Sequence, residues 1–209
     1  MARPDPRRSR WPRRSLVPKN GHERWSMPRQ HAQPSGEKSL TDGGFDPVAC
    51  RQAVGRVMSR GGRIAILVSR FNEPITQALL GAALHTLKRF GVPTRAVRVI
   101  WVPGAFELPV AAEAAAVSGR YSVIVALGCV IRGETPHFEY VAGEAARGLA
   151  NVALAHRLPV GFGVLTTESL EQAQVRAGGA AGNKGYEAAE AALATAAVLA
   201  QLTRAAPRD

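Results

Sequence analysis

The sequence predicts an α/β protein of flavodoxin-like type: a three-layer sandwich with a parallel sheet of about four strands and helices on both faces. Two observations lead to this prediction. Short runs rich in Val and Ile alternate with longer segments of helical periodicity, which is typical of repeated strand and helix units. Right-handed crossovers then place the helices on both faces of the sheet. Ligands of such sheets bind beyond the carboxyl ends of the strands, so the loops that follow the strands are the candidate sites.

Four apolar runs are predicted as buried strands, and four longer segments between and after them as helices. Gly91, Gly119 and Pro159 follow the first three of these helices and mark where each one ends. The predicted strands are 63–69, 97–102, 122–130 and 160–166, and the predicted helices are 74–90, 108–117, 136–156 and about 186–202.

Residues 1–55 are predicted to form a basic, disordered extension. From Met1 to Gln30 there are nine Lys and Arg residues against two acids, so this segment supplies +7 of the net charge of +11. Pro, Arg, Ser and Gly dominate without a periodic apolar pattern, and such a segment cannot bury enough surface to offset the entropy of ordering. One folded domain over residues 56–204 and a tail over 205–209 complete the predicted organisation.

Composition argues against several classes of protein. No apolar run approaches the roughly 18 to 20 residues that a membrane span requires. Cys50 and Cys129 lie far apart, and Cys129 lies in an apolar run where a reduced thiol is usual, so we expect a reducing, cytoplasmic location. No Cys/His cluster has metal-ligand spacing, and no metal is expected. The basic extension lacks a nucleic-acid recognition motif, so a nucleic-acid partner is not favoured.

The loop after the first strand holds an aromatic residue among polar ones. Phe71 can stack on a flat heterocycle, and a residue that merely covers the sheet edge is an equal alternative. Asn72 can cap the helix that follows, and Pro74 suits its first turn.

Glycines beside aromatic residues follow the second strand and interrupt the fourth. Gly104 and Ala105 allow a ligand to approach the backbone, and Glu107 offers an acceptor for amide or hydroxyl groups. The alternative for Glu107 is a carboxylate that caps the next helix. Residues 161–163, Gly-Phe-Gly, suggest close approach of a flat ligand, or a strand packed tightly on a neighbouring element.

The loop after the third strand predicts an anion site. Thr135 is a good N-cap, Pro136 suits the first helical position, and Gly133 frees the preceding turn, so that several backbone N–H groups point out of one helix end. A phosphate is the natural occupant. His137 follows in the first turn, where the helix dipole disfavours the imidazolium, and is therefore a candidate acid and base.

Two cations lie among glycines after the fourth strand. Arg176 and Lys184 are placed to bind phosphate or to pair with an acid of another subunit. A Walker lysine pattern is absent from the sequence, which argues against a nucleoside triphosphate as ligand.

Taken together, six motifs resemble the 6,7-dimethyl-8-ribityllumazine synthase family. They occur in order between about Arg63 and Leu202, and the ordered set is far more specific than any single motif. The motifs are R-F-N-E, G-A-F-E-L-P, G-C-V-I-R-G-E-T-P-H-F-E-Y-V, F-G-V-L-T-T, R-A-G and G-N-K-G.

The resemblance implies roles for individual residues. A pocket for a pyrimidine and its ribityl chain is implied at Phe71, Ala105, Phe106, Glu107, Cys129, Val130, Ile131 and Phe162. A phosphate site is implied at Gly133, Glu134, Thr135 and Arg176, and His137 matches the proton-transfer histidine of the family. Lys184 is expected to have a structural or charge-pairing role.

The resemblance also implies the reaction and the assembly. Such enzymes join 5-amino-6-ribitylaminouracil to 3,4-dihydroxy-2-butanone 4-phosphate and release phosphate and water, with no cofactor or metal. A homo-oligomer is implied, either a pentamer or an assembly of pentamers, with each active site between neighbouring subunits. The Phe71 segment would then be able to serve a neighbour's pocket.

Three other interpretations remain open from the sequence. An archaeal-type riboflavin synthase shares the fold but uses lumazine itself, whereas the R-G-E-T-P-H loop with Arg176 favours a phosphorylated substrate. A non-catalytic flavin-binding or lumazine-binding protein, or a shell-forming scaffold, would need neither His137 nor Arg176. In the third interpretation the basic extension recruits nucleic acid to an oligomeric core.

Overall fold

The structure, a computed structural model, describes residues 47–59 and 61–203. The predicted disorder of the extension up to residue 46, and the predicted tail over 205–209, lie outside these residues. The helices are α1 (Pro47–Ser59), α2 (Glu73–Arg89), α3 (Leu108–Val117), α4 (His137–His156), α5 (Leu170–Arg176) and α6 (Lys184–Leu202). The strands are β1 (Ile64–Ser69), β2 (Val97–Val102), β3 (Val123–Ile131), β4 (Val160–Thr167), β5 (Ala177–Gly179) and β6 (Gly182–Asn183).

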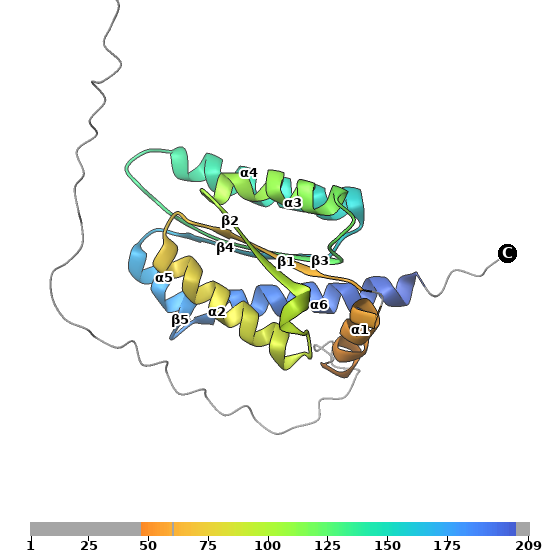
Figure 1. The fold of residues 1–209 in the computed structure, drawn as a ribbon. Helices are drawn as coiled ribbons and strands as arrows, with labels where there is room; N and C mark the ends of the chain where they lie inside the picture. The colour runs from red at the N-terminus through yellow and green to blue at the C-terminus, as the bar shows by residue number, and fades with distance from the viewer. Residues whose placement is uncertain (1–46, 60, 204–209) are drawn as a thin grey trace, which may run out of the picture. The chain divides into compact units, whose positions relative to one another are not determined.

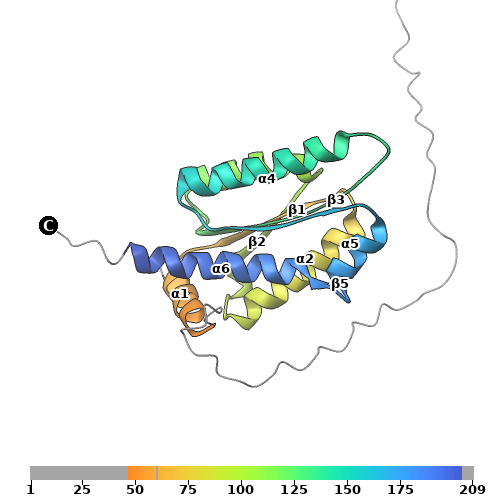
Figure 2. The same ribbon diagram turned by 180° about the vertical axis from the view of Figure 1, so that it is seen from behind.

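The four longer strands form one parallel sheet in the order β2-β1-β3-β4. Its register aligns Ile64 with both Val97 and Val123, and Ile124 with Val160. Helices α3 and α4 cover one face, and α2, α5 and α6 cover the other (Figures 1 and 2). This arrangement confirms the predicted flavodoxin-like sandwich.

Successive side chains of β1 enter two separate cores, because residues of a strand alternate between the faces of the sheet. Ile64, Ile66 and Val68 pack with α2 and α6, whereas Ala65 and Leu67 pack with α3 and α4. All five are fully buried. The central strand is thus covered on both faces, which explains its continuous apolar sequence.

Glycines let helix α6 approach the sheet and α2 very closely. A β-carbon built on Gly161 would lie 2.1 Å from the carbonyl oxygen of Ala188 in α6, and one on Gly185 would lie 2.0 Å from that of Leu79 in α2. A β-carbon on Gly163 would lie 2.6 Å from a methyl carbon of Leu127. The glycines around Phe162 therefore serve tight packing inside the chain, which is the second of the two interpretations given to them.

Helix α1 crosses the boundary that was predicted after residue 55. Cys50 and Val54, one helical turn apart, are buried in the core beside α6. The extension was therefore drawn too long: residues 47–55 are helical rather than disordered. The apolar residues of this segment are interrupted by Arg51, Gln52, Gly55 and Arg56, which left too weak a periodic pattern for the helix to be predicted.

The sequence analysis also did not predict α5 or the antiparallel pair of β5 and β6.

In the part of the chain that the structure describes, no helix combines the length and the apolar character that crossing a membrane would need.

Candidate active site

The carboxyl ends of all four parallel strands lie at one edge of the sheet, and hydrogen bonds continue between the chain segments that leave them. Arg70 N donates to Val102 O over 2.8 Å, and Phe71 N donates to Pro103 O over 3.0 Å. On the other side, Arg132 N donates to Thr167 O over 2.8 Å. Backbone hydrogen bonds therefore join the loop after β1 to the end of β2, and the loop after β3 to the end of β4.

Asn72 fastens the β1 loop to the end of β3. Its backbone is left-handed, with φ at 58°, and its Nδ2 donates to Cys129 O over 2.9 Å. Asn72 thus occupies the N-cap position of α2 but makes no side-chain cap, contrary to the prediction, because its side chain is directed at β3. Pro74 lies in the first turn of α2 as predicted. The ring of Phe71 is 69% exposed, beside the β2 loop of its own chain.

The β2 loop adds a second exposed ring and a carboxylate. In the short helix η3 (Ala105–Glu107), Ala105 is buried and Phe106 is 55% exposed. Glu107 precedes α3 without capping it, so the alternative role given to this carboxylate is not found. A β-carbon on Gly104 would lie only 3.0 Å from Glu107 Oε2, which shows that the carboxylate folds back over the loop backbone.

The end of β3 contributes backbone rather than reactive side chains. Cys129 and Val130 are buried and Ile131 is partly exposed. Burial raises the pKa of the Cys129 thiol to about 11, so this group stays protonated near neutral pH and is not a nucleophile there. The carbonyl of Cys129 is already engaged by Asn72.

Helix α4 begins at His137 and has an uncapped first turn. Pro136, not Thr135, occupies the N-cap position, and no side chain caps the helix. The prediction for Thr135 and Pro136 was therefore wrong: Pro136 itself turns the chain, with φ at −62° and ψ at −1°, and its carbonyl accepts from Glu139 N over 2.9 Å. Residues 133–137 are all exposed, and a β-carbon on Gly133 would meet no atom within 4 Å. The positive end of the helix thus faces open space.

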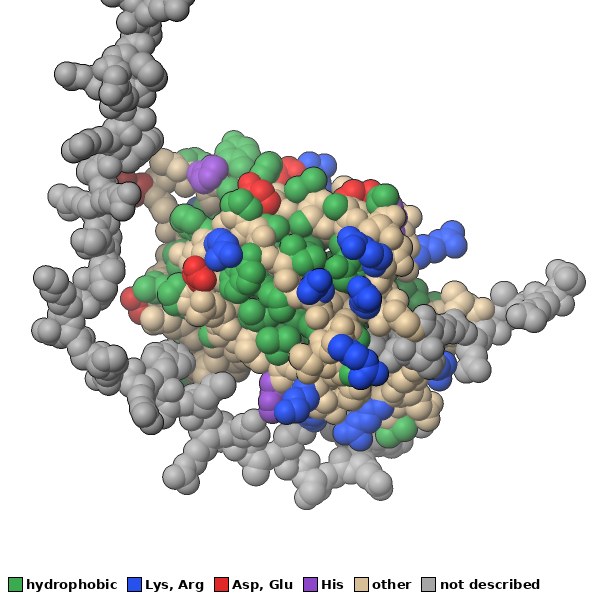
Figure 3. All heavy atoms as spheres, viewed as in Figure 1, with side chains coloured by type: hydrophobic (Ala, Val, Ile, Leu, Met, Phe, Trp, Pro, Cys, Tyr) green, Lys and Arg blue, Asp and Glu red, His purple; other side chains and the backbone are tan. Residues whose placement is uncertain are grey.

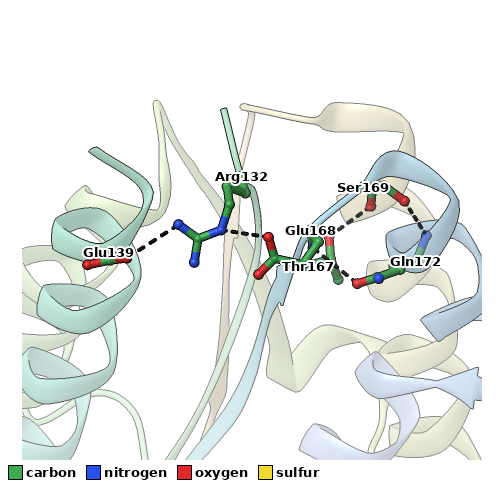
Figure 4. A network of polar contacts seen from close by, with 6 residues as sticks. All are labelled: Arg132, Glu139, Thr167, Glu168, Ser169 and Gln172. Atoms are coloured by element: carbon green, nitrogen blue, oxygen red, sulfur yellow. Dashed lines mark hydrogen bonds and ion pairs between the residues drawn. The ribbon is translucent and has the colours of Figure 1, made fainter. Parts of the chain in front are cut away.

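Arg132 joins both sides of this loop, and the sequence analysis missed it (Figure 4). Its Nε donates to Glu168 Oε2 over 2.6 Å, and its Nη1 lies 3.3 Å from Glu139 Oε1. Its guanidinium carbon lies 4.4 Å from the centre of the Phe138 ring. The only sequence signal was an arginine at a strand end, with one acid in the next helical turn and another after the next strand, which is common at protein surfaces.

Arg176 and Phe162 do not join these residues within one chain. Arg176 ends α5, on the face of the sheet opposite α4, where its Nη1 donates to Gln172 O over 2.9 Å. Phe162 is 47% exposed on the edge strand β4. It precedes Thr167 by five residues, which is about 16 Å along a strand. Lys184 pairs with Glu187 of its own chain over 2.7 Å.

Most of the positive charge of the described residues lies away from this edge. Figure 3 shows Lys and Arg side chains gathered toward the half of the molecule where the strands begin. Exposed arginines precede or begin three strands there: Arg63, Arg95, Arg98 and Arg120. An anion at the carboxyl edge would therefore be held by particular groups rather than by a broad positive field. No group of three or more His, Cys, Asp or Glu able to hold a metal occurs in residues 47–59 and 61–203.

Comparison with known proteins agrees with this geometry. The family model for 6,7-dimethyl-8-ribityllumazine synthase matches residues 61–200. The chain belongs to this family. One relative, named 6,7-dimethyl-8-ribityllumazine synthase and found in Nitratidesulfovibrio vulgaris (strain DSM 19637 / Miyazaki F), is 51% identical over 148 residues, which are 71% of this chain and 95% of the relative. The chain is therefore an enzyme of riboflavin biosynthesis, a transferase.

The lumazine synthase match begins before β1 and includes all four strand ends described above. Helix α1 lies outside it, although α1 packs on α6, which lies almost wholly inside it.

Proposed function

We propose that this lumazine synthase condenses 5-amino-6-(D-ribitylamino)uracil with 3,4-dihydroxy-2-butanone 4-phosphate to give 6,7-dimethyl-8-ribityllumazine, phosphate and water. One observation carries the proposal for the site. Two exposed aromatic rings and a carboxylate lie at the same sheet edge as an uncapped helix start that bears an exposed histidine. A flat heterocycle and a phosphate ester therefore both find complementary groups there.

The pyrimidine is assigned to the ends of β2, β1 and β3. Phe71 and Phe106 supply rings against which the flat uracil can stack. Glu107 can accept hydrogen bonds from the ribityl hydroxyls or from a ring N–H, since its carboxylate lies over the loop at Gly104. Ala105, Cys129, Val130 and Ile131 would form the remaining wall, mainly through backbone and apolar contact.

The phosphate is assigned to the start of α4. The amides of residues 133–135 and the positive end of the helix dipole favour a dianionic oxygen there. Arg132 is not the cation of this site, because Glu139 and Glu168 already neutralise it. Arg176 fits that role better: its hydrogen bond goes to a backbone carbonyl, and no carboxylate of the described residues pairs with it.

The chemistry is carried mainly by the substrates. The 5-amino group attacks the ketone, and loss of water gives an imine; phosphate is then eliminated. The ribitylamino nitrogen closes the ring by attack on the second carbonyl carbon, and a second water is lost. His137, next to the leaving phosphate, would take protons from the attacking amine and return them to the departing oxygen. Holding both substrates in contact supplies most of the remaining acceleration.

A neighbouring copy is proposed to complete each site. His137 begins α4 on one face of the sheet and Arg176 ends α5 on the other, and no hydrogen bond of the described residues joins the two side chains directly. Phe162, on the free edge of the sheet, is likewise far from the other aromatic rings. A homo-oligomer, such as a pentamer or an assembly of pentamers, would let a neighbour contribute Arg176 and Phe162. Phe71 then serves its own chain's pocket, beside Pro103. We further propose that the enzyme works in a reducing cytoplasm, consistent with the burial of both cysteines, Cys50 and Cys129.

The test is an absorbance assay with the purified full chain and both substrates. The expected result is formation of the lumazine chromophore together with an equal amount of phosphate, faster than the spontaneous reaction. Assembled protein that binds the pyrimidine or a flavin without any acceleration would instead support a binding or scaffold protein.

A further inference from the structure

We propose that Arg132 is a positioning residue that holds the first turn of α4, and with it His137, in the geometry needed for turnover. This inference rests on the proposed function and adds a residue to which the sequence motifs gave no role. Arg132 is the first residue after β3, so its backbone is anchored to the sheet through Thr167 O while its side chain reaches outward.

Arg132 contacts the first turn of α4 at the two positions that follow His137. Phe138 and Glu139 directly follow the histidine, and the guanidinium contacts both: the first through its ring, the second through its carboxylate. The loop 133–136 has no cap of its own at the helix start. Phe138 also packs against the core on this face of the sheet, but Arg132 makes the polar contact that joins the strand end to the turn bearing His137.

A second branch leads from Arg132 to α5. The carboxylate of Glu168 accepts a hydrogen bond from the Arg132 guanidinium. The backbone N–H of Glu168 donates to Gln172 Oε1 over 3.0 Å. Gln172 is also held by Ser169, the N-cap of α5, and its carbonyl accepts from Arg176. Figure 4 shows the network running from Glu139 through Arg132 to this helix start. One guanidinium thus links the turn of His137 to the helix that ends in the proposed phosphate cation.

The charges distinguish this role from direct phosphate binding. The hydrogen bonds that Arg132 donates to Glu168 and Glu139 raise the pKa of its guanidinium, which therefore stays charged. Two carboxylates against one guanidinium leave the cluster net negative, which is unfavourable for a phosphate. The planar fork of arginine can contact both acids at once, whereas a lysine ammonium is a single point charge.

The experiment measures kcat and KM for both substrates in Arg132→Ala, Arg132→Lys and Glu168→Gln, each compared with Arg147→Ala. Arg147 is the matched control, since it lies on α4 and pairs with Glu144 on the exposed surface away from the first turn. We expect Arg132→Ala to lower kcat by roughly tenfold. This is less than the loss of about 10²-fold that a misplacement of reacting groups by about 1 Å can cause. Arg132→Lys should recover part of the loss, Glu168→Gln should show a smaller loss in kcat, and Arg147→Ala should match the wild type.

A double variant tests whether Arg132 acts through His137. In a His137→Ala background, adding Arg132→Ala should change kcat less than about twofold, because the residue being positioned is already gone. Hydrogen exchange of the peptide spanning residues 133–140, measured in assembled protein without substrate, should be faster in Arg132→Ala and unchanged in Arg147→Ala.

Three outcomes would overturn the inference. An unchanged kcat in Arg132→Ala would remove the positioning role. A rise in KM for the sugar phosphate alone would make Arg132 a phosphate ligand, and an equal loss of kcat with and without His137 would separate the two residues. If the wild-type chain itself gives no lumazine, the proposed function fails instead; faster exchange at 133–140 would then still support the structural link.

Discussion

Among the described residues, no side chain forms a hydrogen bond or an ion pair with His137, whereas three charged residues around the α4 start pair with one another. Arg132 is paired with both Glu139 and Glu168, whereas His137 is exposed at the first position of the helix. A group in this situation can exchange protons with a substrate without first breaking an internal ion pair. This freedom is what a proton-transfer role requires.

Replacing His137 by alanine should slow turnover by roughly 10²-fold or less. General acid and base groups contribute about 10² to 10⁴, and here the substrate brings its own nucleophilic amine, so the lower end applies. The measurement is kcat from lumazine absorbance, with pyrimidine binding determined in parallel. Weaker pyrimidine binding at unchanged kcat would assign His137 to recognition rather than to proton transfer.

Replacing Arg176 by alanine should chiefly weaken the sugar phosphate. Losing a hydrogen bond from a charged group costs about 1.5 to 3 kcal/mol, which corresponds to a rise in KM of roughly 10- to 100-fold. Titration of each substrate separately checks this, with Arg120→Ala, an exposed arginine at the opposite edge, as the control. If Arg176→Ala impaired the pyrimidine alone, the phosphate assignment would be wrong.

The thiol of Cys129 should resist alkylation in the native protein. Burial raises its pKa from 9.0 to about 11, so almost no thiolate exists at neutral pH. In a Cys50→Ser variant, labelling by iodoacetamide should be slow at pH 8 and become fast on unfolding. Because the folded protein holds this proton more tightly than the unfolded chain, stability should fall as pH rises from about 9 toward 11. Rapid native labelling at pH 8 would contradict the burial.

Among the elements, α6 depends on glycine where it crosses α2. Gly185→Ala should destabilise the protein by at least about 1 to 3 kcal/mol, because the new carbon would lie 2.0 Å from Leu79 O and backbone would have to move. Gly81→Ala is the matched control: it lies in α2, where an added carbon meets no atom within 4 Å, and should stabilise by about 0.5 to 1 kcal/mol. Denaturant unfolding midpoints compare the two variants, and equal shifts would exclude a steric cause.

The long elements could be predicted from sequence because each carries a strong periodic pattern. The four parallel strands and helices α2, α3, α4 and α6 lie within about two residues of their predicted bounds, the uncertainty usual for such boundaries. Helix α5 has only seven residues, which is too short for a clear pattern, and the apolar residues of α1 are interrupted by charged and polar ones and by a glycine. Caps were the weakest predictions: Asn72 and Thr135 are common caps by composition, but tertiary contacts and Pro136 decide these positions.

The loops of the candidate site could also be predicted from sequence, because they follow strands whose positions the periodic pattern gives. Ligands of parallel sheets meet the carboxyl ends of the strands, so Phe71, Phe106, Glu107 and His137 could be assigned to one edge before any coordinates. Arg176 and Phe162 were assigned from local patterns, a cation among glycines and an aromatic residue between two glycines, and then by motif resemblance. Neither source carries information on which face of the sheet a residue occupies. Arg132 was missed because its role depends on two acids that the fold, not the sequence order, brings together.

At the scale of the whole molecule, His137 and Arg176 lie on opposite faces of the sheet, which leads to a prediction about oligomers that contain two different variants. In the proposed head-to-tail ring, each site would take His137 from one chain and Arg176 from the next. Co-assembly of His137→Ala with Arg176→Ala chains in equal amounts should therefore restore about one quarter of the sites, assayed at low sugar phosphate. The separately assembled variants, mixed without exchange, are the control. Absence of any recovery in verified hybrids would mean that both residues act in one chain.

The central place of β1 has a consequence for how the chain folds. Among the described strands β1 is made first, yet it pairs with β2 on one side and with β3 on the other. At synthesis rates of about 5 to 20 residues per second, roughly sixty further residues are added over some 3 to 12 s before β3 is complete. During that time the apolar segment Ile64–Ser69 has an unpaired edge, the kind of segment that joins strands of other chains. Early capture by a chaperone, or early covering by α2, would protect the nascent chain at this stage.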